Sequence, residues 1–330
     1  MDQVALYDIM YALAARDGRE AALFGDCALA AREAFLRSQV GEVFPELWLE
    51  FPLAGDPWLD FHALISYVDV AGTQATFSGQ GGAYADALAW FAAQEPDTVR
   101  QLALSYDTST GDVGHPAVQL LVHKEDLKVP LGFLEAVGRP DAVECYRAFA
   151  KSMPGAWYAC YVGVFPRREA GDADRWVRVE CIVSGDWQRT YADSKEALRE
   201  HLAHVGLQGA SDEAVDIIQV LARSPFPLEL QFNVGPGGKV LPVVSASVRF
   251  QPQDWLSDER RQAIEQLACQ LEGVGLVDER WKLLSSTSYA KRVAHHGEST
   301  MIACFPAFVK VRWREGMPLD AKAYLLALVQ

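Results

Sequence analysis

Basic residues recur in extended segments of the second half of the chain, where they alternate with apolar residues. They are Arg178, Arg249, Lys310, Arg312 and Lys322. Alternation with a period of two places one kind of side chain on each face of a strand. Neighbouring strands that bring these cations to one height could bind a phosphate group through charge-assisted hydrogen bonds. The alternative is that Glu180 and Glu229, on the same faces, neutralise them, and the sequence favours neither reading.

A second set of residues indicates proton transfer and contact with an aromatic or cationic group. Glu50, in the extended run 46–52, could accept a proton as a general base, or could be a solvated strand residue with no catalytic role. Aromatic faces stabilise cations. Four aromatic residues are candidates for this role, namely Trp48, Tyr161, Trp176 and Tyr324. At least two of these are expected to be plain packing residues, while Glu229 and Gln231 are predicted to face the same space.

Other motifs do not support a nucleotide, metal or nucleophile site. The run 235–239 is rich in Gly but lacks the spacing of a phosphate-binding loop, so it is predicted to be a hairpin turn. His295 and His296 have no Cys or acidic residue at ligand spacing and are predicted to lie in a loop, so no metal site is predicted. The cysteines are interpreted as buried free thiols of a reducing compartment. They are Cys27, Cys145, Cys160, Cys181, Cys269 and Cys304.

Five pairs of extended segments supply the elements that would position these residues. The members of each pair are joined by a stretch rich in Gly, Pro, Asp or Ser, which is typical of β-hairpins. The pairs are 46–52 with 59–69, 100–107 with 117–123, 157–165 with 175–184, 227–234 with 240–250, and 305–313 with 321–329. Helical patterns separate the pairs, at 18–38, 82–95, 131–152, 194–205, 212–223 and 257–271. Asp193 is predicted to cap the helix at 194–205.

The repeat of helix and hairpin predicts an α/β fold in which ten antiparallel strands close into a β-barrel surrounded by helices. Closure removes both exposed edges of the sheet. The apolar face of each strand is then expected to point outward beneath the helices, and the polar face to line a lumen that can hold a ligand. An open sheet with a wet polar face is the alternative. Residues 1–330 are predicted to be a single domain, with N-terminal helices in 1–40 and barrel repeats in 41–330.

The hydrophobic content and net charge of the chain disfavour some classes of binding partner. The chain has 330 residues, of which 50% are hydrophobic, and a formal net charge of −14. Such a chain can bury a large core, but its acidity repels nucleic acid and anionic membranes, so neither is expected as a partner. The N-terminus shows neither a signal peptide nor a membrane span, and the expected location is the cytoplasm.

The predicted architecture resembles that of the αββα-barrel aromatic prenyltransferases, which include the dimethylallyl-tryptophan synthases and the cyanobactin peptide prenyltransferases. The resemblance spans roughly residues 40–330. In that family a Glu on the first barrel strand takes the proton from the acceptor, and Glu50 stands at the matching place. The family binds the prenyl diphosphate with Lys, Arg and Tyr alternating along strands. Lys322-Ala323-Tyr324 has this form and Lys310-Val311-Arg312 a related one.

The resemblance implies a transferase that attaches an isoprenoid from a prenyl diphosphate to an aromatic or peptide acceptor, with Glu50 as the catalytic base. The implied diphosphate-binding residues are Arg178, Arg249, Lys310, Arg312, Lys322 and Tyr324. The implied substrate-binding residues are Trp48, Tyr161, Trp176, Glu229 and Gln231. The one cofactor considered is Mg²⁺, accompanying the prenyl diphosphate.

Two strands depart from the family pattern. The second offers His62 and Ser66 in place of Arg, and the fourth offers Gln119 and His123 where many relatives carry a basic residue. These departures leave a second function open: a catalytically inactive barrel that binds a peptide or small ligand and assists a biosynthetic pathway.

Overall fold

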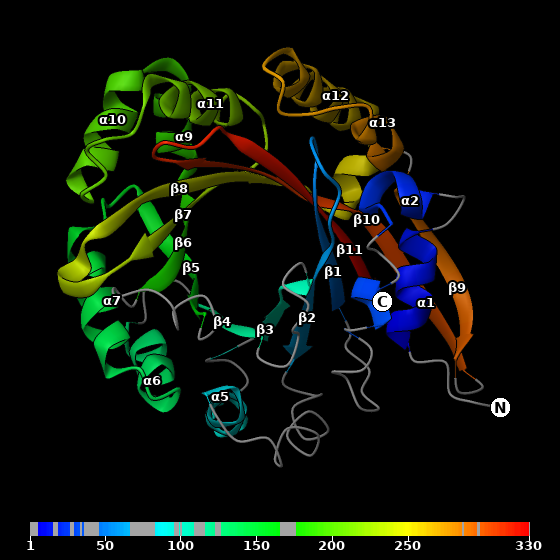
Figure 1. The fold of residues 1–330 in the computed structure, drawn as a ribbon, viewed down its shortest axis with the longest axis horizontal. Coiled ribbons are helices and arrows are strands. Elements are labelled where there is room, and N and C mark those ends of the chain that lie inside the picture. The colour runs from blue at the N-terminus through cyan, green and yellow to red at the C-terminus, as the bar shows by residue number, and fades with distance from the viewer. Residues whose placement is uncertain are drawn as a thin grey trace.

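The central feature of the computed structural model is a ring of ten antiparallel strands (Figure 1). The structure describes residues 6–15, 19–26, 30–33, 35, 46–66, 83–95, 99, 101–108, 116–122, 127–165, 176–285, 287–295 and 298–329. Within these residues the strand order is β11-β1-β2-β3-β4-β5-β6-β7-β8-β10, and β10 pairs with β11 to close the ring. The predicted ten-stranded barrel is therefore confirmed.

All five predicted hairpins form, with bounds close to those expected from the turn residues. The barrel strands are β1 (Glu46–Pro52), β2 (Asp60–Ser66), β3 (Gln101–Tyr106), β4 (Ala117–Leu121), β5 (Trp157–Val164), β6 (Val177–Val183), β7 (Leu228–Val234), β8 (Val240–Arg249), β10 (Glu298–Arg314) and β11 (Asp320–Val329). Gly237 and Gly238 adopt positive φ in the β7–β8 turn, which confirms the hairpin predicted for 235–239.

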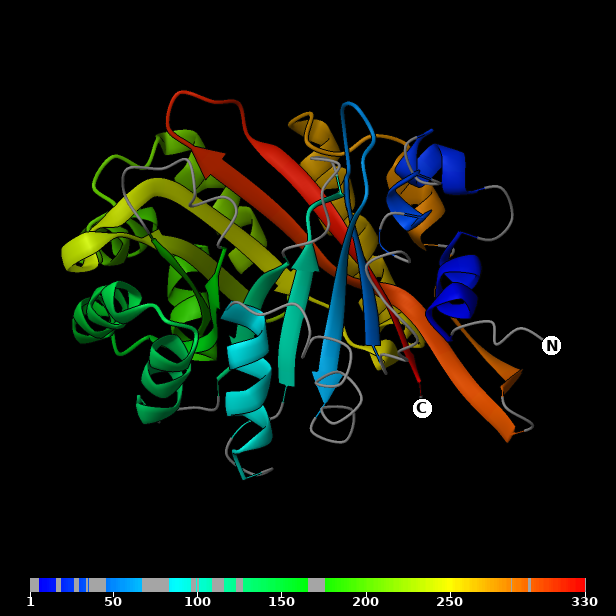
Figure 2. The same cartoon turned by 60° about the horizontal axis from the view of Figure 1, so that its bottom comes forward.

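An eleventh strand, β9 (Tyr289–His295), was missed. It pairs with the first part of β10, which begins at Glu298 rather than at the predicted Phe305, and this hairpin extends beyond the barrel (Figure 2). The prediction that His295 lies in a loop is wrong, while His296 lies outside the described residues. Ala290, Lys291 and Arg292 are all exposed, so β9 lacks the buried face that marks the barrel strands.

Helices cover the outside of the barrel (Figure 1). They are α1 (Leu6–Ala14), α2 (Arg19–Phe24), α5 (Ala83–Ala92), α6 (Lys128–Ala136), α7 (Pro140–Ser152), α9 (Gly185–Asp193), α10 (Lys195–His204), α11 (Asp212–Ala222), α12 (Asp258–Gly273) and α13 (Arg280–Ser285). The helix predicted over 131–152 is two helices, because Gly138 turns the chain at φ 72° and Pro140 begins a new one. The helix predicted over 18–38 is likewise interrupted, since α2 ends before Gly25 at φ 72°.

The cap predicted at Asp193 is wrong. Asp193 is the last residue of α9, a helix that the sequence analysis did not predict. Ser194 is the N-cap of α10, and its hydroxyl oxygen accepts a hydrogen bond from the backbone N–H of Ala197 at 3.2 Å. A single serine thus ends one helix and begins the next.

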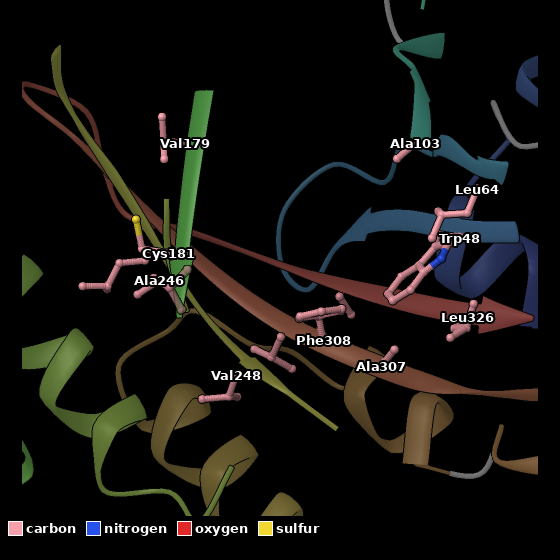
Figure 3. Close-up of a cluster of buried hydrophobic side chains, with 14 of the residues drawn as sticks. Trp48, Leu64, Ala103, Val179, Cys181, Ala246, Val248, Ala307, Phe308 and Leu326 are labelled. Atoms are coloured by element: carbon pink, nitrogen blue, oxygen red, sulfur yellow. The ribbon is translucent and has the colours of Figure 1, made fainter. Parts of the chain in front are cut away.

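Alternation along the strands sorts side chains as predicted, apolar outward and polar inward. On β6, Val177, Val179 and Cys181 are fully buried in the main hydrophobic core, whereas Arg178 and Glu180 line the lumen. Figure 3 draws a cluster of buried apolar side chains that includes Val179 and Cys181, and in it Trp48 of β1 and Leu326 of β11 lie close together. The register pairs these two residues directly.

The cysteines follow the predicted pattern with one exception. Cys145, Cys160 and Cys181 are free and buried and Cys304 is buried, but Cys269 on α12 is free and exposed, so its predicted burial is wrong. Its position on the outer face of an amphipathic helix explains the difference, because Ala268 and Leu271 form the buried face. Cys27 lies outside the described residues. No described helix is both long and apolar enough to span a bilayer.

Candidate active site in the barrel lumen

A cavity of about 370 Å³ occupies the lumen, and its lining comes from all ten barrel strands. This volume is within the range of small-molecule sites, roughly 300–1,000 Å³. Among the described residues five basic side chains line it, namely Arg178, Lys310, Arg312, Arg314 and Lys322. Among the same described residues, the acidic side chains that line the cavity are Glu50, Glu180 and Glu229. The lining therefore favours an anion, provided that these carboxylates do not neutralise every cation.

The structure brings the predicted site residues together, apart from Arg249. Those that line the cavity are Trp48, Glu50, Tyr161, Trp176, Arg178, Glu229, Gln231, Lys310, Arg312, Lys322 and Tyr324. The Arg249 guanidinium instead lies over the Phe308 ring at 4.9 Å and is 4.0 Å from the Glu229 carboxylate. The register explains this, because Arg249 pairs with Phe308, two residues along the strands from the Ser247–Lys310 pair. The prediction that Arg249 binds a diphosphate in this cavity is therefore not supported.

Glu50 lies at the centre of a hydrogen-bonded chain on β1, β2 and β11. The Lys322 ammonium donates to Glu50 Oε1 at 2.5 Å, and His62 Nε2 lies 2.8 Å from Glu50 Oε2. His62 Nδ1 is 2.7 Å from the Ser105 hydroxyl, which accepts a hydrogen bond from the Gln119 amide at 2.7 Å. Burial raises the pKa of Glu50, but Lys322 and His62 outweigh it and hold that pKa well below its usual range. Glu50 is thus ionised at neutral pH.

Glu180 organises a second polar cluster on the opposite wall. It accepts hydrogen bonds from the Lys310 ammonium at 3.1 Å and the Gln231 amide at 2.8 Å. Burial raises the pKa of Glu180, but Lys310 and Gln231 more than offset this and keep it below the usual value. Burial and then the Glu180 carboxylate raise the pKa of Glu229 to about 8, against the smaller opposing effect of Arg249. Glu229 is therefore a neutral acid at pH 7, able to donate its O–H to Glu180.

The other lining cations contact aromatic or acidic groups near the hairpin turns. The Arg178 guanidinium lies over the Phe165 ring at 4.0 Å and donates to the Asn233 side-chain oxygen at 3.1 Å. Arg312 donates to Asp320 at 2.7 Å. Five basic side chains face three acidic ones in the described lining, so its net charge is positive even when all three glutamates are ionised.

Aromatic side chains adjoin the cations along the same two strands. Lys310 pairs with Lys322 across β10 and β11, and two residues along each strand Phe308 pairs with Tyr324. The ring centroids of Phe308 and Tyr324 are 5.9 Å apart, and the Phe308 and Trp48 centroids are 5.3 Å apart. Tyr324 is also the direct partner of Glu50 on β1. A row of cations, a row of aromatic rings and a carboxylate therefore meet at one place.

The sequence reading missed several lining residues. Arg314 continues the alternation of Lys310 and Arg312, so period two alone would have found it. The same alternation places Asn233 on the lumen face of its strand with Glu229 and Gln231, where the structure has it. The hydrogen-bonded set of His62, Ser105 and Gln119 comes from three different strands. Its members meet only through strand register, which no local pattern reveals.

Comparison of whole structures identifies the architecture. No protein-family model and no curated protein matches the sequence. The 6-dimethylallyltryptophan synthase from Micromonospora olivasterospora, solved in complex with DMASPP and Trp, superposes with a TM-score of 0.57 at 13% identity, over 98% of this chain and 97% of that one. A second 6-dimethylallyl tryptophan synthase gives 0.55 at 14% identity, over 98% and 96%. The apo form of the prenyltransferase PriB gives 0.57 at 12% identity, over 98% and 96%.

The chain has the αββα-barrel fold of aromatic prenyltransferases. The fold resemblance inferred from the repeat of helix and hairpin is thereby confirmed. Since these αββα barrels share so few residues with this chain, their likeness establishes the fold, and the function must be argued from the lumen itself.

Proposed function

We propose that this protein is a transferase that attaches an isoprenoid from a prenyl diphosphate to an aromatic acceptor. The observation that carries the proposal is the adjacency of the Lys310–Lys322 pair to the Phe308–Tyr324 pair, with Glu50 on the next strand. The two lysines would bind the diphosphate, and the two rings would flank the isoprenoid. This arrangement matches the three chemical parts of such a reaction: a leaving anion, a carbocation and a proton to be removed.

The proposed reaction follows from these groups. The bond between C1 of the isoprenoid and the diphosphate oxygen breaks, and its electron pair leaves with the diphosphate, where lysine ammonium groups stabilise the charge. The allylic cation lies against the aromatic faces, each worth about 0.5–2 kcal/mol. A carbon of the acceptor ring bonds to the isoprenoid, and the displaced proton passes to Glu50. Trp48, Tyr161 and Trp176 would contact the acceptor, together with Glu229 and Gln231.

Among its described residues the lumen shows no separate site for Mg²⁺. Glu50 and Glu180 are each already paired with a lysine. Within the ranges that the structure describes, no three His, Cys, Asp or Glu side chains gather as a metal-binding group. Mg²⁺ would therefore enter as a companion of the donor diphosphate.

A second candidate function is supported by one specific observation. Lys310, Lys322 and Arg312 each have a carboxylate partner, as expected of a lumen that is neutralised internally. Such a barrel could bind a peptide or small ligand without catalysis. The prenyltransferase is preferred because the described lining holds five basic side chains against three acidic ones, so its net charge is positive. A peptide acceptor, the cytoplasmic location and the absence of nucleic-acid and membrane partners stay predictions.

The test is product formation. The protein is incubated with dimethylallyl or geranyl diphosphate, with and without Mg²⁺, and with tryptophan, tyrosine or short peptides containing them. Mass spectrometry is expected to show an aromatic acceptor enlarged by one isoprenoid unit. If no acceptor is modified while a peptide or small ligand still raises the melting temperature, the second candidate is correct instead.

A further inference from the structure

Two lysines lie on directly paired positions in the lumen, and each forms an ion pair with a different carboxylate. Lys310 and Lys322 are direct partners across β10 and β11, an arrangement in which like charges repel. Glu50 holds the Lys322 ammonium at 2.5 Å, and Glu180 holds that of Lys310 at 3.1 Å. Because β1 and β6 are different walls of the barrel, the two ion pairs draw the ammonium groups in different directions.

An anion between these lysines would change both pairs. Lys322 and Lys310 keep 15% and 12% of their side chains exposed and line the cavity, so both can reach a ligand there. Each ammonium has three donors on a flexible stem and can redirect one to a phosphate oxygen. A diphosphate carries more charge than a carboxylate and can accept from both lysines at once. It would also remove the repulsion between them.

We infer that a diphosphate bound between Lys310 and Lys322 draws Lys322 away from Glu50 and thereby prepares Glu50 to accept the acceptor's proton. This inference rests on the proposed function and adds an order of events to it: the donor binds first, and its binding activates Glu50 as the base. The proton displaced when the acceptor carbon bonds to the isoprenoid goes to the Glu50 carboxylate, and the electron pair of the broken C–O bond leaves with the diphosphate.

The groups around Glu50 determine whether its pKa rises or falls when Lys322 moves away. From β2 it faces His62 and Asp60, and from β11 it faces Lys322 and Tyr324. Burial raises the pKa of Glu50, and Lys322 is the largest opposing influence, followed by His62. Once Lys322 turns to an anion, burial is opposed by His62 alone. Glu50 then becomes the stronger base that proton transfer requires.

A double-mutant cycle on donor affinity tests this coupling. The dissociation constants of inorganic pyrophosphate and of the unreactive analogue dimethylallyl S-thiolodiphosphate are measured by calorimetry at one pH and salt concentration. The proteins are the wild type, Glu50→Gln, Lys322→Met and the double variant. In the wild-type background Glu50→Gln is expected to tighten binding roughly three- to tenfold, because Lys322 no longer has an ion pair to leave. In the Lys322→Met background the same change is expected to alter affinity less than about twofold.

Asp60→Asn is the matched control. Asp60 pairs directly with Glu50 across β1 and β2, and is bound by the backbone N–H of Thr108. Its replacement removes a carboxylate at the same level of the barrel without removing the partner of Lys322. The coupling is overturned if Glu50→Gln tightens binding no more than Asp60→Asn does, or tightens it equally without Lys322. Failure of the wild type to bind either ligand would reject the donor site itself, a result distinct from binding without coupling.

Discussion

Replacement of Glu50 by Gln is expected to lower the rate of prenyl transfer roughly 10²- to 10⁴-fold while leaving the barrel folded. The amide has the shape of the carboxylate: its oxygen can accept a hydrogen bond from Lys322, and its NH2 group can donate to the His62 ring nitrogen, in place of the two carboxylate oxygens of the wild type. It cannot accept the acceptor's proton. Ionisation of the donor does not need that proton transfer, so slow release of diphosphate without product is expected to persist.

The measurement is the steady-state rate of product formation beside that of diphosphate release. Asp60→Asn again serves as the control, since it changes the adjacent carboxylate and not the proposed base. A Glu50→Gln protein that makes product within threefold of the wild-type rate would exclude Glu50 as the base. His62 would then be the group to examine, because it is the nearest alternative proton acceptor in the same chain.

Replacement of Glu229 by Gln is expected to flatten the pH dependence of folding stability. Burial in the barrel wall, next to Glu180, raises the pKa of Glu229 to about 8 from the 4.5 of an unburied glutamate. A raised folded-state pKa contributes stability that is fully present below 4.5 and is lost as the pH rises through 8, because only the unfolded chain releases the proton in that interval. The loss approaches about 1.4 kcal/mol per pH unit.

Glutamine at position 229 keeps a donor facing Glu180 at every pH and has no proton to release. The free energy of unfolding, measured with urea at several values between pH 5 and 8, should therefore fall more steeply for the wild type, and the variant should be the more stable protein at pH 8. Glu213→Gln, at an exposed position on α11, controls for the loss of one charge. Parallel curves for the wild type and Glu229→Gln would show that Glu229 is ionised in the folded protein.

The barrel was predictable from the sequence because period-two alternation persists through strands whose outer face is covered by helices. Val177, Val179 and Cys181 mark that face so regularly that the opposite set, including Arg178 and Glu180, could be assigned to the lumen. Strand β9 gives no such signal, since its residues 290–292 are all exposed. It could not be told from a loop without knowing that β10 continues past the barrel.

The site could be predicted as a set of residues but not as a set of contacts. Lys322 and Glu50 are 272 positions apart and meet only because β11 returns to pair with β1. The sequence also does not show that Arg249 lies beside Phe308 rather than beside Lys310, because these neighbours depend on the register between β8 and β10. The ion pairs of Lys310 with Glu180 and of Lys322 with Glu50 likewise form only because the sheet closes into a ring, and they determine whether each lysine is available to a ligand.

The central claim, that the lumen binds a prenyl diphosphate, is tested most directly by a crystal structure with dimethylallyl S-thiolodiphosphate and an aromatic acceptor. The expected result has diphosphate oxygens within hydrogen-bonding distance of Lys310 and Lys322, the isoprenoid against Phe308 and Tyr324, and the Lys322 ammonium no longer bound to Glu50. A lumen without the analogue at saturating concentration, or a diphosphate bound elsewhere while the Lys322–Glu50 pair stays intact, would contradict the account.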